Sequence, residues 1–174
     1  MKKVLTVIAL AFVAMNMSAQ NMYVGGGVRF ESTSDETLFA IQPEVGYQLN
    51  DKFGIGGVIG FGTSGSGNTR YSEFIIKPYV RHQILNIGGN VNLFFDYELA
   101  FQNAGVKDAK TNTFLIGVEP GLAYNLNSKL SVVTHLGLVG YQSSKLDVSG
   151  SKAVNKFTIK GLTQNVSLSL YYNF

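Results

Sequence analysis

The segment Val91–Gln102 reads VNLFFDYELAFQ, and this stretch decides the fold class. Its odd-numbered positions are all large and apolar, whereas its even-numbered positions include Asn92, Asp96, Glu98 and Gln102. Successive side chains of a β-strand point to opposite faces, so one face of this strand would be apolar and the other mostly polar. The pattern predicts a strand that separates an apolar environment from a polar one.

The same alternation recurs along most of the chain. After residue 20 no convincing stretch carries apolar residues at the spacing of a helix, so an all-β fold is expected. Together with 91–102, the expected strands are residues 22–31, 37–50, 53–63, 72–85, 113–126, 130–142 and about 157–174. In 130–142 the alternation puts Leu138 on the apolar face and Tyr141 on the polar face.

The composition of the two faces decides which one points inward. The apolar faces are long and rich in aromatic residues, while the polar faces carry charges of both signs. A soluble eight-stranded barrel would line its cavity with the apolar face, but a membrane barrel turns that face to lipid and keeps the charges inside. The sequence favours the second arrangement, an eight-stranded antiparallel up-and-down transmembrane β-barrel, because closure also leaves no unpaired strand edge in lipid.

The connections alternate in length. Short ones are expected at 50–52, 86–89 and 127–129, and longer polar ones at 32–36, 63–71, 103–112 and 143–155. In bacterial membrane barrels the short turns face the periplasm and the long loops face outside. With eight strands, both ends of the barrel domain are then expected in the periplasm.

The first residues have the features of a secretory signal. Lys2 and Lys3 precede an uncharged, apolar-rich run from Val4 to Met15, and Ser18 and Ala19 offer small residues for cleavage. The run is too short for a membrane-spanning helix, which needs about 20 residues; the alternative is a short anchor that is never cut. We therefore expect a cleaved signal peptide at 1–19, followed by one barrel domain at 20–174.

Composition excludes several classes of function. Of the 14 Lys and Arg residues, removing Lys2 and Lys3 leaves 12 against 11 Asp and Glu, so the net charge of 20–174 is about +1 and no nucleic-acid partner is expected. The chain has no Cys, and its two His residues, His82 and His135, are expected in different parts of the barrel. No catalytic, metal or cofactor site is expected, and no enzyme.

Three expected hairpins share a pattern. Each has a proline on the apolar face, then alternating apolar residues, then a turn that begins with Asn: Gln42–Asn50, Lys77–Asn86 and Glu119–Asn127. A proline inside a paired strand removes a ladder hydrogen bond, so its recurrence predicts a bulge or bend. These are the only three prolines in the chain.

These hairpins, the Ser-Ala-Gln sequence at 18–20 and the segment 168–174 (LSLYYNF) resemble small bacterial outer-membrane β-barrel proteins of the OmpX/OmpA-barrel type. In particular, the chain is similar to the porin-family barrels of Bacteroidetes-type bacteria. The resemblance covers residues 20–174 and implies location in the cell outer membrane, in contact with lipid and lipopolysaccharide. It implies no single activity, because members of the family do many different things. The peptidoglycan-binding domain of OmpA-type proteins is not carried over.

The resemblance also implies an assembly signal at the end of the chain. In this family, a terminal strand of alternating apolar residues that ends in an aromatic residue is read by the barrel-assembly machinery. Here the matching residues are Val166, Leu168, Leu170, Tyr172 and Phe174.

The polar residues expected inside the barrel form a candidate network: Arg29, Glu44, Lys77, Arg81, Asp96, Glu98, Glu119 and His135. Counting register across the short turns puts Lys77 and Arg81 within one pair step of Glu98 and Asp96, and Glu119 opposite or next to His135. Charges in so narrow a space must pair, which predicts a plugged, salt-bridged lumen. Ion or proton conduction through it is the alternative.

The longest expected loop is basic. Lys145, Lys152 and Lys156 lie in or beside it, and they could contact lipopolysaccharide phosphates or another anionic partner. The alternative is a solvated loop without a partner. The leading hypothesis is a monomeric, non-enzymatic barrel with a structural or surface-binding role and an unidentified extracellular partner; the second is a small passive channel.

Overall fold

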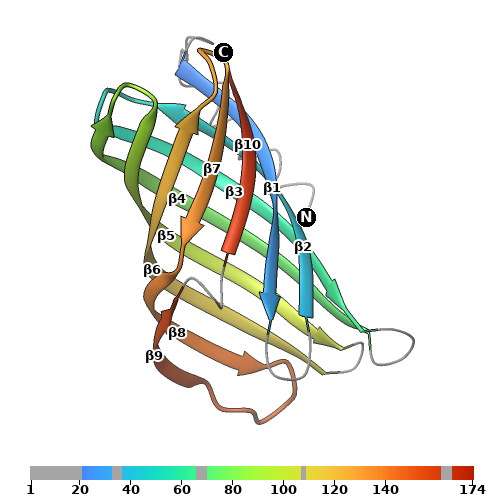
Figure 1. Ribbon diagram of the computed structural model, residues 1–174. Helices are drawn as coiled ribbons and strands as arrows, with labels where there is room; N and C mark the ends of the chain where they lie inside the picture. Colours follow the sequence, from blue (N-terminus) through green and yellow to red (C-terminus); the bar gives the residue numbers. More distant parts are fainter. Residues whose placement is uncertain (1–20, 33–36, 66–69, 107–108, 162–165) are drawn as a thin grey trace.

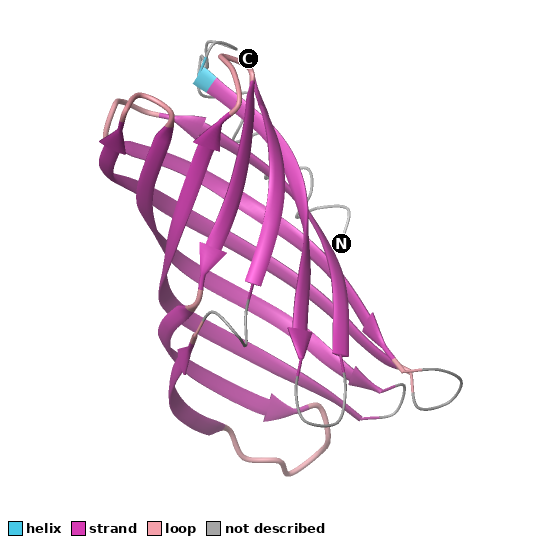
Figure 2. Cartoon of the chain, in the orientation of Figure 1, coloured by secondary structure: helices cyan, strands magenta, loops and turns pink. Residues whose placement is uncertain are grey.

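The computed structural model describes residues 21–32, 37–65, 70–106, 109–161 and 166–174, almost all of them in β-strands (Figure 2). The strands are β1 (Met22–Ser32), β2 (Thr37–Gln48), β3 (Phe53–Ser64), β4 (Tyr71–Ile87), β5 (Val91–Val106), β6 (Ala109–Asn125), β7 (Leu130–Leu136), β8 (Leu138–Leu146), β9 (Val154–Lys160) and β10 (Val166–Asn173). None of the described segments forms a helix long and apolar enough to span a membrane.

The strands close into a single antiparallel barrel (Figure 1). Consecutive strands pair from β1 to β6, β7 and β8 both pair with β6, and the β1–β10 ladder closes the ring. Because β7 and β8 follow one another along β6, they are two parts of one wall strand, and β9 and β10 are likewise two parts of the last. The expected eight-stranded up-and-down architecture is confirmed.

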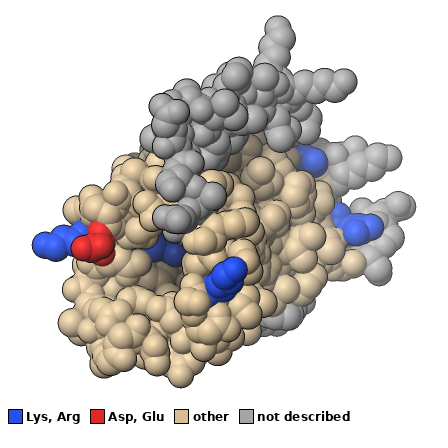
Figure 3. All heavy atoms as spheres, turned by 90° about the horizontal axis from the view of Figure 1, so that it is seen from above, with Lys and Arg blue, Asp and Glu red and all other residues tan. Residues whose placement is uncertain are grey.

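The two faces of the wall differ as the alternation predicts. Phe101, Ile116 and Leu168 are each more than half exposed on the outside, while Asp96, Glu98 and other charged residues of the same strands are buried inside. In the view from above in Figure 3, the charged side chains that can be seen are separated by uncharged surface. An apolar belt around a charged interior is the arrangement of a transmembrane barrel and the reverse of a soluble one.

The turns at one end of the barrel are built by asparagines. Asn50 Oδ1 accepts hydrogen bonds from the backbone N–H groups of Lys52 and Phe53, at 2.9 and 3.0 Å. Asn127 does the same for the N–H groups two and three residues further on. These side chains stabilise the short connections that the sequence predicts, and we call this end of the barrel the turn end. Phe174 lies at the turn end, and the opposite end is called the loop end (Figure 1).

The predicted loop at 103–112 is wrong, and the one at 143–155 is too long, because only residues 147–153 lie outside the strands. β5 continues to Val106 and β6 begins at Ala109, so residues 103–106 and 109–112 pair with each other. β8 and β9 likewise pair from Leu138–Lys160 to Ser144–Val154 and form a hairpin that ends the barrel wall at the loop end (Figure 1). Polar residues in these segments suggested loops, but they lie in strands beyond the apolar belt, where both faces can be polar.

The predicted faces of Leu138 and Tyr141 are also wrong. Leu138 is buried and Tyr141 is 49% exposed, because the wall strand has a bulge at Gly137. Val118 pairs with Val139 and Gly121 with His135, so three residues on one strand lie opposite two on the other. Gly137 has a φ of +100°, which favours glycine. One extra residue exchanges the inner and outer faces of everything that follows in β8.

The prolines mark interruptions in the strand ladders. Opposite Pro43 and Pro78 the ladder to the following strand lacks pairs but keeps its register. Opposite Pro120 the register shifts by one residue, at the Gly137 bulge. The prediction of a bulge is therefore right for one of the three prolines, and the other two cause only a local gap.

Gly25 lies where β1 closes the barrel against β10. A Cβ added there would collide with the Tyr171 ring and lie 2.6 Å from the Leu170 carbonyl oxygen. At the adjacent Gly26, an added Cβ would come no closer than 3.4 Å, an ordinary contact. Of these two glycines, Gly25 is the one that requires the absence of a side chain.

Replacing Gly25 by alanine is expected to lower the free energy of unfolding by about 1–3 kcal/mol, the usual cost of overpacking. Gly26→Ala is the matched control, because both substitutions change the unfolded chain equally. Urea unfolding of the refolded protein in lipid vesicles measures the difference. Equal stability of the two variants would contradict the close approach at Gly25.

Candidate functional site

Arg81 is the centre of the polar interior. Its Nε and Nη2 donate to the two carboxylate oxygens of Asp96, both at 2.8 Å, and Nη2 lies 3.5 Å from Glu44 Oε1. Arg81 on β4 and Asp96 on β5 are direct cross-strand partners, so the ladder itself brings them together. All three residues are at least 95% buried. A bidentate pair between an arginine and a carboxylate is among the strongest ion pairs in proteins.

Aromatic rings surround the Arg81 guanidinium. Its Cζ lies 4.0 Å from the centre of the Phe94 ring and 5.1 Å from that of Tyr79. The rings of Tyr23 and Tyr171 lie at 5.6 Å and stack on each other. We call Arg81, Asp96, Glu44 and these four aromatic residues the Arg81 cluster. Cation–π attraction adds to the ion pairs here, since the site is removed from water.

Hydrogen bonds connect the rings to the acids. Tyr79 donates to Glu44, and the Tyr23 and Tyr79 hydroxyls lie 2.7 Å apart. Glycines on neighbouring strands provide the room: Gly56 pairs with Tyr79, and a Cβ on Gly46 would collide with the Tyr23 ring. Large side chains from β1, β10, β4 and β5 therefore fill the lumen above glycines of β2 and β3.

His135 and Ser167 extend the cluster across the barrel. His135 Nε2 lies 2.9 Å from Asp96 Oδ2, and its Nδ1 lies 2.9 Å from Ser167 Oγ. This order of acid, imidazole and hydroxyl is the connectivity of a hydrolase triad. However, Asp96 is already engaged by Arg81, and the cavity that Ser167 lines has a volume of only about 70 Å³, which leaves no room for an acyl substrate.

Lys77 forms a second layer with two acids. Its Nζ lies 2.6 Å from Glu119 Oε2 and 3.0 Å from Glu98 Oε2, so one cation serves two carboxylates. The three residues come from the adjacent strands β4, β5 and β6. Both acids are 4% exposed. Such an arrangement depends on the cation, because the two carboxylates would otherwise repel each other in a poorly solvated space.

Arg29 and Glu73 form a third layer towards the loop end. The Arg29 guanidinium donates to Glu73, and Gln102 Nε2 donates to the other carboxylate oxygen of Glu73 at 2.9 Å. Arg29 is on β1 and Glu73 on β4, so the pair crosses the lumen. The cavity of about 70 Å³ lies among the three layers and is lined by Glu44, Lys77, Arg29 and other polar residues.

The predicted site residues therefore lie in different parts of the molecule. The structure brings together the eight predicted lumen residues, and it places Leu168, Leu170, Tyr172 and Phe174 on the outer surface, each at least 38% exposed. The side chain of Val166 lies outside the described residues. Lys145, Lys152 and Lys156 are exposed on or beside the β8–β9 hairpin and are not gathered into the lumen network.

Sequence reasoning missed several members of the network. Glu73 has the same strand face as Lys77 and Arg81, so alternation alone could have identified it. Ser167 and Tyr171 could have been found in the same way, because they alternate with Leu168, Leu170 and Tyr172. Among the described residues, no group of three or more His, Asp or Glu side chains could hold a metal ion.

Comparison with known proteins places the fold. No protein-family model matches the sequence, and no curated protein matches it. Solved outer-membrane structures do match. The outer membrane protein OprG from Pseudomonas aeruginosa has a TM-score of 0.59 at 10% identity, with 91% of this chain and 97% of that chain covered.

Two further structures give the same result. Neisserial surface protein A has a TM-score of 0.55 at 15% identity, covering 90% of this chain and 98% of its own. A major outer membrane protein from Thermus thermophilus has a TM-score of 0.51 at 14% identity, covering 88% and 98%. This chain therefore has the fold of small outer-membrane β-barrel proteins.

Proposed function

We propose that this chain is an integral protein of the bacterial outer membrane, with a closed lumen and a non-enzymatic, structural or surface-binding role. The observation that carries the proposal is the Arg81 cluster. It joins an ion pair and four aromatic rings, with the His135 imidazole beside Asp96, at a level of the barrel where Phe94 is 1% exposed and Arg81 is 4% exposed. A solute would have to displace these groups to pass.

The energetics support a closed state. Opening a path through the Arg81 cluster would separate Arg81 from Asp96 while both remain enclosed by protein. Removing the partner of a buried charge costs about 3–5 kcal/mol, so a spontaneous open state would be rare. The Lys77 layer and the Arg29–Glu73 pair add two further constrictions.

The orientation follows from the connections. The turn end is proposed to face the periplasm, together with the mature N-terminus after cleavage at Ala19 and the C-terminus, and the β8–β9 hairpin then projects outside. Lipid contacts the apolar belt, lipopolysaccharide surrounds the loop end, and the barrel is a monomer. The exposed terminal residues from Leu168 to Phe174, with Val166, are proposed as the signal for the barrel-assembly machinery.

A passive channel is the second candidate, and one observation favours it. The small cavity and a larger one at the loop end share Gln102, Thr113, Gln142 and Lys160 in their linings, so the two spaces adjoin. The Arg29–Glu73 pair, the Lys77 layer and the Arg81 cluster still lie between the loop end and the turn end. The channel hypothesis requires that cluster to open.

Planar-bilayer recording separates the two functions. The pure refolded protein is expected to give no reproducible conductance steps. The charge-balanced double variant R81A/D96A is expected to give steps, because it removes the central ion pair, while Glu44 keeps its hydrogen bond from Tyr79. Heat-dependent mobility on a gel checks that both proteins are folded. Stable steps from the wild-type protein would favour the passive channel.

A further inference from the structure

A cavity of about 650 Å³ opens into the lumen at the loop end. We call it the outer cup. It is lined by the loop-end residues of β2 to β6, by β8 and by the inner face of β9, and it adjoins the small cavity beneath it. Its volume lies within the range of about 300–1,000 Å³ that small-molecule sites occupy.

The floor of the outer cup is closed by paired charges. Glu73 lines the cup, but its carboxylate is engaged by Arg29 and by Gln102. The negative charge of Glu73 is therefore balanced within the floor. A ligand that enters from outside would reach a cavity closed at its base. Such a cavity favours binding of the ligand over its transport through the barrel.

The wall of the cup is largely uncharged, and polar side chains alternate there with apolar ones such as Leu38, Ala104 and Val106. Besides Tyr71, six hydroxyl and amide side chains line it: Ser64, Gln102, Thr111, Thr113, Gln142 and Ser144. Some are already oriented by one another, since Thr113 lies 3.0 Å from Ser144 and Gln142 donates to Ser144 at 2.8 Å. Hydroxyls and amides retain further donor and acceptor positions, so this wall is matched to a ligand rich in hydroxyl groups.

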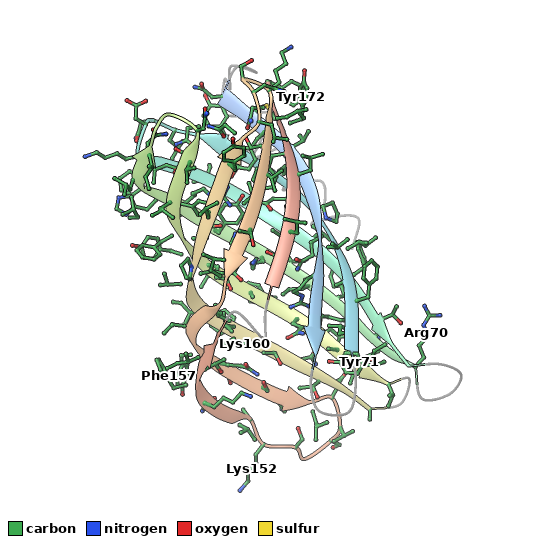
Figure 4. All side chains as sticks on the ribbon, in the orientation of Figure 1. Arg70, Tyr71, Lys152, Phe157, Lys160 and Tyr172 are labelled. Carbon is green, nitrogen blue, oxygen red and sulfur yellow. The ribbon has the colours of Figure 1, made fainter. Side chains whose placement is uncertain are left out.

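One side of the cup is basic. Lys156 and Lys160 both line it from β9, with Thr158 between them on the same face. Figure 4 shows Lys160 on β9 and Tyr71 at the start of β4, on opposite sides of the barrel at this end. Glu73 is the acidic residue among those that line the cup, and Arg29 pairs with it, so the basic side of the cup favours an anionic group, with Lys156 as its exposed cation.

We propose that the outer cup binds a saccharide bearing a carboxylate or phosphate, with its hydroxyls on the polar wall and its anionic group beside Lys156 and Lys160. This inference rests on the proposed surface-binding function and names its ligand class. A cation is disfavoured by the lysines, and an apolar ligand by the six polar side chains. The acidic saccharide could be soluble or could belong to the lipopolysaccharide around the barrel.

Calorimetric titration of the refolded protein in uncharged detergent tests the proposal. The probes are a galacturonic acid disaccharide and the neutral galactose disaccharide of the same linkage. Saturable binding of the acidic probe is expected, with the neutral probe at least tenfold weaker. Lys156→Gln and Lys160→Gln are each expected to weaken binding of the acidic probe about tenfold, the usual effect of losing one charged hydrogen bond.

Lys152→Gln is the matched control, because Lys152 is exposed on the same hairpin outside the cup (Figure 4). It should leave the affinity unchanged. The proposal is overturned if neither probe binds, if both probes bind equally, if K156Q and K160Q bind like wild type, or if K152Q weakens binding as much as they do. K156Q changes an exposed residue, so it remains informative even if K160Q fails to fold.

The source of the ligand is tested in vesicles. If lipopolysaccharide supplies it, adding lipopolysaccharide to phosphatidylcholine vesicles will lower the apparent affinity for the soluble acidic probe, and if not, the affinity will stay the same. Either result presupposes the cup site. The proposed function fails separately, because conductance steps from the wild-type protein would overturn the closed lumen whatever the titrations show.

Discussion

Replacing Asp96 by alanine is expected to lower the free energy of unfolding by about 3–5 kcal/mol, because it leaves Arg81 buried with its main partner removed. Asp96 is 2% exposed and accepts two hydrogen bonds from Arg81 at 2.8 Å, as well as lying 2.9 Å from His135 Nε2. Urea unfolding in lipid vesicles, followed by circular dichroism, measures the loss.

Two controls make this result specific. Asp51→Ala removes a carboxylate from the exposed turn after β2 and should change stability by no more than about 0.5 kcal/mol. The double variant R81A/D96A should lose less stability than the sum of the two single variants, because the pair is removed together. Simple additivity would show that Arg81 and Asp96 do not depend on each other.

Replacing Lys77 by methionine is expected to cost a similar amount, about 3–5 kcal/mol. Methionine keeps most of the side-chain volume, so the effect reports charge rather than packing. Lys77 is the cation between Glu98 and Glu119, at 3.0 and 2.6 Å, and without it two buried carboxylates face each other. The same unfolding measurement applies.

Neutralising one acid should rescue this variant. The double variant K77M/E119Q retains a single carboxylate, Glu98, and a glutamine that can donate a hydrogen bond to it. It is expected to recover a substantial part of the stability that K77M loses. Lys52→Met, at an exposed turn position, is the matched control and should be close to wild type. If K77M/E119Q is less stable than K77M, repulsion between the two acids is not the cause of the loss.

Sequence reasoning worked best for relations between neighbouring strands. Alternation determines which residues share a face, and counting from the turn between β4 and β5 brings Arg81 to within one pair step of Asp96. The bulge between Gln83 and Leu85, which the count does not include, makes the two residues direct partners. Contacts across the lumen cannot be found in this way. Arg29 and Glu73 lie on strands three positions apart in the sheet. Whether their side chains come into contact depends on the tilt and width of the barrel, and counting paired residues along neighbouring strands gives neither.

Local irregularities account for the errors. Counting by twos fails beyond Gly137, because one extra residue reverses the faces of Leu138 and Tyr141. The predicted loops at 103–112 and 143–155 failed for another reason. Few residues of 103–106, 109–112 and 143–146 are apolar, so the alternation is weak there although the backbone ladder continues. A polar stretch there is compatible with either a strand or a loop.

The stack of Tyr23 on Tyr171 has a consequence for how the barrel is made. The two rings come from β1 and β10, the first and last strands, and both belong to the Arg81 cluster. Arg81, Asp96, Tyr79 and Phe94 come from β4 and β5, which are synthesised together and can pair early. The cluster is completed only when β1 pairs with β10. Barrel closure and filling of the interior are therefore one cooperative step in folding.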